Sequence, residues 1–240
     1  MRVLMSVISH DQRSLVNDFL LSLDRYLTTS KYDVVVCVTN NLQDISWDEK
    51  FEKFSLCTIQ NIRPKGFGDN HNSAFSAYDS DFFFIVNPDI LLCRQMQLDW
   101  LIPQIPQGGL ASPRIISPSG GIEDFCRTDP SLTNLVMRKI GIKTVGIPSG
   151  FTWIAGMFMM FHSNFFRAIK GFDTRYFMYV EDCDLCKAIT LNSGELRVLH
   201  EYDVVHAAQR ASDRLSEHLW WHVKSLIKFW LKSVRQYPKI

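Results

Sequence analysis

The sequence predicts an α/β protein built around a mostly parallel sheet with helices on both faces. In the first half of the chain, short apolar runs alternate with segments of helical periodicity. The runs carry apolar residues at successive positions, which is typical of parallel strands buried on both faces. Hydrophobic residues make up 46% of the 240 residues, which excludes a disordered chain, a collagen-like fibre and a coiled coil.

The first half, residues 1–103, is expected to hold alternating strands and helices. Its composition predicts strands at Val3–Ile8, Asp33–Val38, Ser55–Gln60 and Phe82–Val86. Periodicity predicts helices at Gln12–Tyr26, more weakly around Asp48–Phe54, and from the turn Gly66–Gly68 through Tyr78. Ligands bind beyond the carboxyl ends of the strands in such sheets, so the residues after each strand are candidates for a site. These are Ser9-His10, Thr39-Asn40-Asn41 and Asn87-Pro88-Asp89.

The second half, residues 104–211, is expected to be less regular and continuous with the first in one domain. Gly, Pro and Ser gather at 107–121 and again at 146–150, which favours loops. The elements expected are a strand at Phe151–Phe161, helices at Ser163–Ile169 and Glu181–Leu191, short strands at Glu195–Leu199 and Val204–Val205, and a long helix from Asp213 to Val234.

Charge and cysteine usage limit the partners and the compartment. The 26 Lys and Arg nearly balance the 25 Asp and Glu, so no nucleic-acid partner is expected. No window approaches the ~20 apolar residues of a membrane span, and Met1–Ser9 is too short for a signal peptide. The six cysteines follow no disulfide framework, which indicates reduced thiols in a cytoplasmic protein.

Three carboxylates, Glu181, Asp182 and Asp184, lie where the aromatic segment Tyr176–Tyr179 meets a predicted helix. Acidic residues stabilise helix N-termini, so N-capping is one interpretation. In the other, the aromatic segment partly desolvates the acids. A carboxylate in that setting has a raised pKa and can act as a general base.

Three further features have both a structural and a functional interpretation. Asn87-Pro88-Asp89 is a common turn, but Asp89 can also point into the ligand crevice and bind a divalent cation that holds a diphosphate. His206 is either a structural histidine or a second ligand of that cation. Pro64–Asn72 is either a simple loop and helix cap or a glycine turn that approaches a bound nucleotide or sugar.

Taken in order, these motifs resemble glycosyltransferase family 2, in particular the rhamnosyltransferase-like branch of O-antigen and capsule sugar transferases. The resemblance spans nearly the whole chain. It is carried by Gly66–Asn72 (GFGDNHN), Asn87–Ile90 (NPDI), Trp153–Gly156 (WIAG), Gly171–Leu185 (GFDTRYFMYVEDCDL) and His206.

The resemblance implies a GT-A fold with a Rossmann-like sheet and an inverting sugar transfer. The expected donor is a nucleotide-sugar, first dTDP-rhamnose and alternatively a UDP-hexose; the acceptor is a hydroxyl of a glycan or a polyprenyl-linked glycan in bacterial surface-polysaccharide assembly. Residues 1–103 then form the nucleotide-sugar-binding half and 104–211 the acceptor and catalytic half, followed by the C-terminal helix of 212–240.

The same resemblance assigns expected roles to individual residues. Asp182 is the catalytic base, with Glu181 as second choice, and Asp89 and His206 hold Mn²⁺ or Mg²⁺. Asn87 stands where the family's metal-binding motif usually has its first aspartate. The expected donor-binding residues are Ser9, Asn40, Gly66, Phe67, Gly68, Asn72, Asn87 and Asp89, and the expected acceptor-binding residues are Trp153, Gly156 and Asp184.

The C-terminal helix is amphipathic, with lysines on the side opposite its apolar residues. One interpretation is a helix that closes the domain and exposes a solvated lysine face. The other is a peripheral contact of 212–240 with the anionic inner face of the plasma membrane.

Two functions of other classes remain open at this stage. A nucleotidyltransferase would also use carboxylates and a metal, but it typically has a basic Gly-rich loop near the N-terminus, where this chain has Ser9–Gln12. The second of these functions is that of a catalytically silent, carbohydrate-binding relative. The presence together of Asp89, Asp182 and His206 argues against it.

Overall fold

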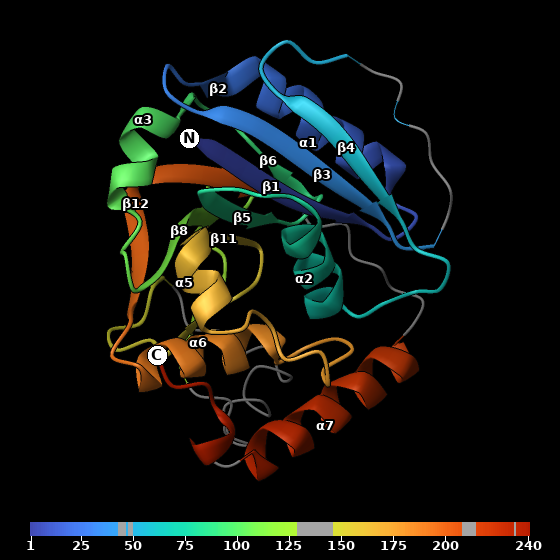
Figure 1. The fold of residues 1–240 in the computed structure, drawn as a ribbon, viewed down its shortest axis with the longest axis vertical. Coiled ribbons are helices and arrows are strands. Elements are labelled where there is room, and N and C mark those ends of the chain that lie inside the picture. Colours follow the sequence, from blue (N-terminus) through green and yellow to red (C-terminus); the bar gives the residue numbers. More distant parts are fainter. Residues whose placement is uncertain (43–46, 48–49, 129–145, 208–214, 233) are drawn as a thin grey trace.

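The computed structural model describes residues 1–240 except 43–46, 48–49, 129–145, 208–214 and 233, and it leaves out the side chains of 215–219 and 234 (Figure 1). Its centre is an eight-stranded sheet in the order β4-β3-β1-β5-β11-β8-β12-β6. These strands are β4 (Ser55–Gln60), β3 (Asp33–Asn40), β1 (Arg2–Ser9), β5 (Phe82–Val86), β11 (Phe158–His162), β8 (Gly109–Ile116), β12 (Glu195–His206) and β6 (Ile90–Leu91).

The sheet is mixed, with most of its pairings parallel. β4, β3, β1 and β5 are parallel to one another, and β12 is parallel to β8. β11 is antiparallel to β5 and β8, and β6 is antiparallel to β12. Two small sheets complete the set: β2 (Leu27–Thr28) with β7 (Met96–Gln97), and β9 (Cys126–Arg127) with β10 (Trp153–Ile154).

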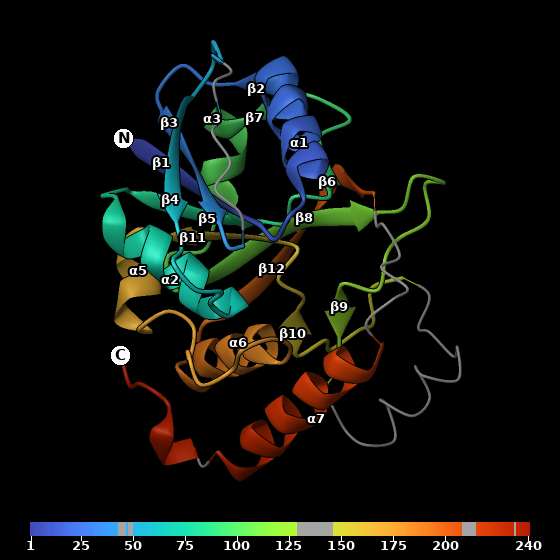
Figure 2. The ribbon, with the colours of Figure 1, turned by 90° about the vertical axis from the view of Figure 1, so that its right-hand side faces the viewer.

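Helices cover both faces of the sheet, as expected. The chain moves outward from β1 to β3 through α1 and returns from β4 to β5 through α2; because such crossovers are right-handed, these helices lie on opposite faces (Figure 2). The strand order therefore reverses between β1 and β5, which is where α/β sheets bind ligands. The helices are α1 (Arg13–Tyr26), α2 (Phe67–Ala77), α3 (Leu98–Leu101), α5 (Ser163–Ala168), α6 (Glu181–Leu191) and α7 (Leu215–Leu231), with 3-10 turns at Ile102–Gln104 and Val234–Gln236.

The predicted strands of the first half and the helix at 181–191 are confirmed, whereas the helix around Asp48–Phe54 is not. Residues 50–54 are not helical, and 48–49 lie outside the described residues. The backbone N–H groups of Glu52 and Lys53 donate to Asp24 Oδ1 of α1 at 3.0 and 3.1 Å. A side chain of the neighbouring helix thus takes donors that a local helix would have used.

The second half contains more of the sheet than its composition suggested. The Gly-, Pro- and Ser-rich stretch 107–121 includes β8, which lies inside the sheet because β11 and β12 pair with it on either side. The two short strands expected at 195–199 and 204–205 are one strand, β12, whose register with β8 shifts between Leu199 and Asp203.

The strand expected at Phe151–Phe161 is instead two strands, β10 and β11, which belong to different sheets. Between them, Ala155 N–H donates to Phe125 O at 2.7 Å and Gly156 N–H donates to the Asp182 carboxylate at 3.0 Å. The backbone therefore leaves the first strand where it meets α6. The C-terminal helix begins at Leu215 in the described chain and ends at Leu231, before the expected Val234.

The core beneath α5 is a cluster of aromatic rings around Phe166, which is 1% exposed. Its ring centroid lies 4.8 Å from that of Phe83, 4.9 Å from Phe75 and 5.1 Å from Phe161. Since Phe166 packs on several elements at once, its removal leaves a cavity that no single element can close.

We expect Phe166→Ala to lower the free energy of unfolding by about 3–5 kcal/mol, because a buried aromatic ring is lost and its cavity remains. Urea unfolding followed by circular dichroism measures the change. Leu21→Ala is the control: this α1 residue is 53% exposed, and the substitution should cost less than about 0.5 kcal/mol. Equal losses in the two variants would contradict this view of the core.

Candidate active site

A cavity of about 350 Å³ opens at the carboxyl ends of β1 and β5, where the strand order reverses. It brings together residues from both halves of the chain. The sequence-predicted site residues that line it are Phe67, Asn87, Asp89, Gly156, Glu181 and Asp182. Other residues line it to which the resemblance assigned no catalytic, donor, acceptor or metal role, including His10, Asn41, Lys65, Arg127 and Trp221.

Asp89 is held at the cavity by the pairing of β6 with β12. His206 lies opposite Ile90 in this pairing, and its Nε2 is 3.0 Å from Asp89 Oδ2. Ala207 N–H also donates to the Asp89 backbone carbonyl at 2.8 Å. On the other side of the turn, Asn87 N–H donates to Met157 O at 2.9 Å. Residues far apart in sequence therefore fix the turn that follows β5.

The Asp89–His206 pair has the chemistry of a cation site. The hydrogen bond to Asp89 raises the pKa of His206, while burial acts in the opposite direction. Asp89 Oδ1 and His206 Nδ1 are buried, and neither has a hydrogen-bond partner in the described part of the chain. The described residues contain no cluster of three or more His, Cys, Asp or Glu that could hold a metal. A cation here would thus need phosphate oxygens as further ligands, which is how Mg²⁺ and Mn²⁺ bind nucleotides.

Glu181 and Asp182 reach the cavity through an unusual backbone turn. Tyr179 and Val180 have φ of +70° and +71°, a left-handed conformation that is rare for a tyrosine and strained for a β-branched valine. α6 begins directly after this turn, at Glu181. The Asp182 carboxylate accepts N–H groups from Cys183 at 2.8 Å and from Gly156 at 3.0 Å, which fixes its direction.

The two carboxylates differ in what stabilises their charge. Burial and the charge of Asp182 raise the pKa of Glu181 well above its usual value, and Glu181 Oε2 has no partner among the described residues. Burial also raises the pKa of Asp182, but the charge of Arg127 and the backbone N–H groups of Gly156, Cys183 and Asp182 itself act against that rise. Asp182 is therefore the better base, because its ionised form has partners that Glu181 lacks.

Arg127 is a site residue that sequence reasoning missed. It lies on β9, and its guanidinium carbon is 4.8 Å from the centre of the Trp153 ring. Its Nε donates to the Asp124 backbone carbonyl at 2.9 Å and pairs with the Asp124 carboxylate at 3.4 Å. β9 is two residues long, too short for any periodicity, so the sequence carried no signal for this position.

Ser9 and Asn40 do not line the cavity, although both were expected to bind the donor. Ser9 is 1% and Asn40 2% exposed, and Asn40 Oδ1 accepts the Trp47 ring N–H at 3.2 Å. The next residue along the chain lines the cavity in each case, His10 after Ser9 and Asn41 after Asn40. Asn41 also fixes the following loop through two hydrogen bonds with the Lys65 backbone, at 2.8 and 3.0 Å.

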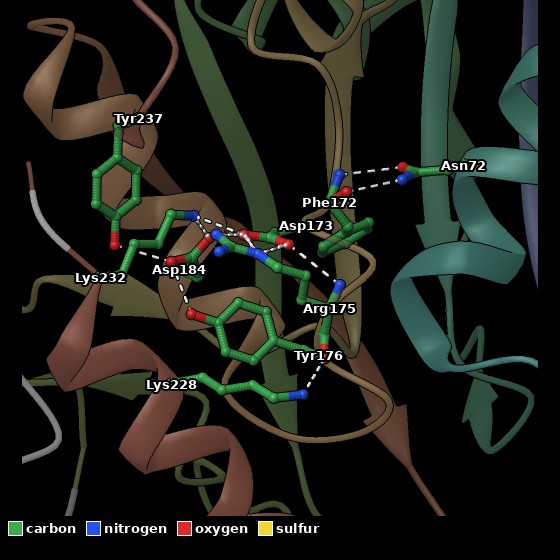
Figure 3. A network of polar contacts seen from close by, with 9 residues as sticks. All are labelled: Asn72, Phe172, Asp173, Arg175, Tyr176, Asp184, Lys228, Lys232 and Tyr237. Carbon is green, nitrogen blue, oxygen red and sulfur yellow. Dashed lines mark hydrogen bonds and ion pairs between the residues drawn. The ribbon is translucent and has the colours of Figure 1, made fainter. Parts of the chain in front are cut away.

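Gly66, Gly68 and Asn72 do not line the cavity, although they were expected to bind the donor; they support the residues that do line it. A Cβ on Gly66 would lie 2.5 Å from Phe177 O, and one on Gly68 would lie 2.6 Å from Phe172 Cβ, so both positions require the absence of a side chain. The Asn72 side chain makes two hydrogen bonds, at 2.8 and 3.0 Å, with the Phe172 backbone (Figure 3). These residues join α2 to the segment that carries the acids, and the members of the Gly66–Asn72 motif that line the cavity are Phe67 and Asn70.

Trp153 and Asp184, two of the expected acceptor-binding residues, lie outside the cavity lining. Trp153 is buried and donates its ring N–H to Thr128 O at 2.8 Å. Asp184 lies in a buried network, where Lys232 Nζ is 2.6 Å and Tyr237 OH 2.8 Å from its carboxylate (Figure 3). Asp184 therefore anchors the C-terminal segment, and Gly156 is the expected acceptor residue that does line the cavity.

The same network fixes the segment that precedes the acids. Lys232 is 5% exposed and also pairs with Asp173 at 2.9 Å, and Arg175 forms a second ion pair with Asp173. Despite burial, which raises it, the pKa of Asp173 is lowered by its hydrogen bonds with Arg175 and Lys232 (Figure 3). Lys228 Nζ donates to the Arg175 backbone carbonyl.

No family model matches the chain, whereas comparison with individual proteins finds relatives. The chain is 27% identical over 184 residues to Rhamnosyltransferase WbbL of Escherichia coli K12, covering 68% of this chain and 69% of that protein. It is also 27% identical over 184 residues to the N-acetylglucosaminyl-diphospho-decaprenol L-rhamnosyltransferase of Mycobacterium tuberculosis, of which it covers 59%.

Solved structures share the fold at low sequence identity. The mannosyltransferase PcManGT of Pyrobaculum calidifontis, in complex with GDP-Man and Mn²⁺, superposes with a TM-score of 0.63 at 16% identity over 100% of this chain and 66% of its own. GalNAc-T7 with UDP, GalNAc and Mn²⁺ gives a TM-score of 0.61 at 12% identity, over 90% of this chain and 45% of its own. The sheet order, the cavity at the strand ends and these similarities together identify the chain as a glycosyltransferase with the GT-A fold, distantly homologous to bacterial rhamnosyltransferases.

Proposed function

We propose that the chain transfers a sugar, with inversion, from a nucleotide-sugar to a hydroxyl of a glycan or polyprenyl-linked glycan. The observation that carries this proposal is that Asp89 and Asp182, from opposite halves of the chain, line the same cavity. Transfer with inversion needs one proton acceptor and one site for the leaving diphosphate. These two carboxylates are suited to those roles, and residues 1–103 and 104–211 then act as donor and acceptor halves.

Asp182 is the proposed catalytic base. Its carboxylate, held by the N–H groups of Gly156 and Cys183, takes the proton from the acceptor hydroxyl. The hydroxyl oxygen forms a bond to the anomeric carbon as the bond from that carbon to the diphosphate breaks. One in-line displacement inverts the configuration, so no second carboxylate is needed as a nucleophile. Glu181 remains the second choice, since its pKa favours the protonated form.

Asp89 and His206 are the proposed protein ligands of a Mn²⁺ or Mg²⁺ ion. Such an ion supplies positive charge that stabilises a leaving diphosphate. The buried, unpartnered Oδ1 of Asp89 and the imidazole 3.0 Å from its other oxygen suit this role. Asn87, in place of a first aspartate, lines the cavity beside Asp89 and adds no charge.

We propose dTDP-rhamnose as the donor, with UDP-hexoses as the alternative. The support is the 27% identity to two proteins named as rhamnosyltransferases. The alternative has a specific observation as well, because TarS of S. aureus, solved with UDP-GlcNAc, shares the fold with a TM-score of 0.58. Lys65 and Asn41 line the cavity next to the β1 and β3 strand ends, where they can contact the nucleotide.

A lipid-linked acceptor in bacterial surface-polysaccharide assembly, of O-antigen or capsule type, completes the proposal. The mycobacterial relative is named for a diphospho-decaprenol acceptor. In the part of the chain that the structure describes, no helix is long and apolar enough to cross a bilayer. We propose that the enzyme meets such an acceptor from the cytoplasmic face of the membrane.

A catalytically silent, carbohydrate-binding relative is the competing proposal. It would keep the cavity but would not need a supported base, whereas Asp182 retains two N–H donors and Arg127 near its carboxylate. Hydrolysis of the nucleotide-sugar in the absence of acceptor separates the two, because only an active site that stabilises the leaving diphosphate releases it.

Asp182→Asn should reduce sugar transfer by about 10²–10⁴-fold, because the amide cannot take the acceptor proton. Nucleotide binding should be retained, since Asp182 is assigned to the acceptor side. The measurements are initial rates of nucleotide release and calorimetry with the nucleoside diphosphate. Glu181→Gln is the matched variant. Near-normal turnover of Asp182→Asn together with an inactive Glu181→Gln would assign the role of catalytic base to Glu181 instead of Asp182.

Arg127→Gln should move the acid limb of the rate–pH profile to higher pH. The charge of Arg127 lowers the pKa of Asp182 against burial, so its loss raises that pKa. The base must be ionised to act; the variant therefore loses activity at a higher pH than the wild type as pH falls, and the two converge in the alkaline range. Arg127→Lys, which keeps the charge, is the control. A uniform loss at all pH values would contradict this electrostatic role.

A thermal-shift panel of dTDP-, UDP- and GDP-sugars with and without Mn²⁺ tests the donor and the cation. A ligand at one hundred times its Kd stabilises the folded state by about 2.7 kcal/mol. For a chain of this length that corresponds to roughly 5–10 °C. We expect the largest shift with dTDP-rhamnose and Mn²⁺, and we expect Asp89→Asn to lose the Mn²⁺-dependent part. A shift that Mn²⁺ does not change would remove the cation from the proposal.

A further inference from the structure

We propose that the outer face of α7 docks on an anionic lipid surface. α7 lies at one end of the long axis of the molecule, beside α6 and the small β9–β10 sheet (Figures 1 and 2). Its two faces differ in what they contact. One packs on the segment that leads to the acids, and the other is exposed and apolar.

The inner face of α7 is bound to the wall of the cavity. Trp221 packs on Phe177 with ring centroids 5.1 Å apart, and both line the cavity. Ser225 donates its hydroxyl hydrogen to Met178 O at 2.9 Å, and His222 stacks on Tyr179 at 4.9 Å. Through these contacts the inner face of α7 packs against residues 177–179. The opposite side of the helix takes no part in them.

The outer face carries large apolar side chains at helical spacing. The first four members are three or four positions apart, and the fifth, Leu231, lies four positions after Ile227, so they form one stripe along the helix. Their exposed fractions are Trp220 59%, Val223 41%, Ile227 48%, Trp230 45% and Leu231 78%. An exposed apolar stripe of this size on one helix marks an interaction surface, because isolated exposed residues do not line up in this way.

The charge around the stripe favours an anionic partner. Lys224 and Lys228 are exposed on α7, and Arg235 and Lys239 follow it. Glu217 is the one acidic residue from 215 to 240 in the sequence. Tryptophans beside lysines on an amphipathic helix are typical of helices that lie in a membrane interface. A second copy of the same face would bring like charges together, which argues against self-association through it.

The cavity borders the inner face of the same helix. Phe177 is 37% exposed and packs on Trp221, which belongs to α7 and lines the cavity. A helix lying on the bilayer would therefore hold the cavity next to lipid head groups. This placement suits the lipid-linked acceptor of the proposed function, and only this last step rests on that proposal.

Flotation with vesicles of phosphatidylglycerol and phosphatidylcholine tests the surface without donor or acceptor. We expect the full chain to float with anionic vesicles at low salt and less at high salt, and not to float with phosphatidylcholine alone. The triple variant Trp220→Ser, Ile227→Ser, Leu231→Ser should reduce binding at least tenfold. Lys224→Gln should reduce it about fivefold, as expected for one basic residue at an anionic surface.

Matched control variants separate docking through α7 from nonspecific adsorption of the protein to vesicles. Leu21 on α1 and Ile62 in the loop after β4 are 53% and 100% exposed, so Leu21→Ser with Ile62→Ser removes exposed apolar surface elsewhere and should float like the wild type. Lys31→Gln is the charge control. Asp182→Asn should float normally, so a failure of catalysis leaves this test intact.

Two results would overturn the proposal. One is an absence of flotation with anionic vesicles at low salt, or flotation that the triple variant leaves unchanged. The other is a concentration-dependent dimer of the wild type, abolished by the triple variant, without vesicle binding; this would assign the stripe to a second copy of the chain. Unchanged melting temperatures of the variants exclude unfolding as the cause.

Discussion

The site depends on how the chain is held in the segment 171–180, just before α6. Tyr179 and Val180 adopt positive φ there, a conformation that costs of order 1–3 kcal/mol at each residue and persists only when neighbouring contacts enforce it. α2 supplies such contacts from one side, through Asn72 and through the approach of Gly66 to Phe177. α7 supplies them from the other, through Ser225 and Trp221. Asp182, the proposed base, therefore follows directly on a strained turn that is held between two helices.

A second constraint lies beneath that turn, where Lys232 is buried between Asp173 and Asp184. Burying charges is costly, and attraction offsets the cost only where geometry and further hydrogen bonds are good. Here the tyrosine hydroxyls of Tyr176 and Tyr237 complete the shell of Asp184. This arrangement ties the first turns of α6 to the end of the chain, and it explains an acidic residue near the site that does not face the cavity.

Much of the fold and part of the site could be predicted from the sequence. Apolar periodicity marks the strands and helices, and site residues follow the strand ends. The apolar runs of β1, β3, β4 and β5 specified the parallel half of the sheet, and the turn after β5 specified Asp89. The errors have physical reasons. Side chains alternate in direction at a strand end, so His10 and Asn41 face the cavity while Ser9 and Asn40 point inward.

Other parts depend on contacts that no local pattern reports. Positions two apart on a helix lie on nearly opposite sides, which separates Asp184 from Asp182. β8 has loop-like composition, and its two neighbouring strands come from distant parts of the chain. Arg127 comes from a two-residue strand, so only the assembled structure places it beside Asp182.

Residues 232–240 support the start of α6, the helix that carries Glu181 and Asp182. Asn192, the residue that follows α6, bonds to Pro238 O at 2.8 Å and to Ile240 N–H at 3.0 Å, while Tyr237 and Lys232 hold Asp184. Trimming the final nine residues would strip both the ammonium and the phenol from a carboxylate that is 4% exposed. An uncompensated buried charge of this kind costs roughly 3–5 kcal/mol, a large share of the stability of a domain. A protease cut within the last turn of α7 would therefore destabilise the start of α6, although it lies far from that helix in sequence.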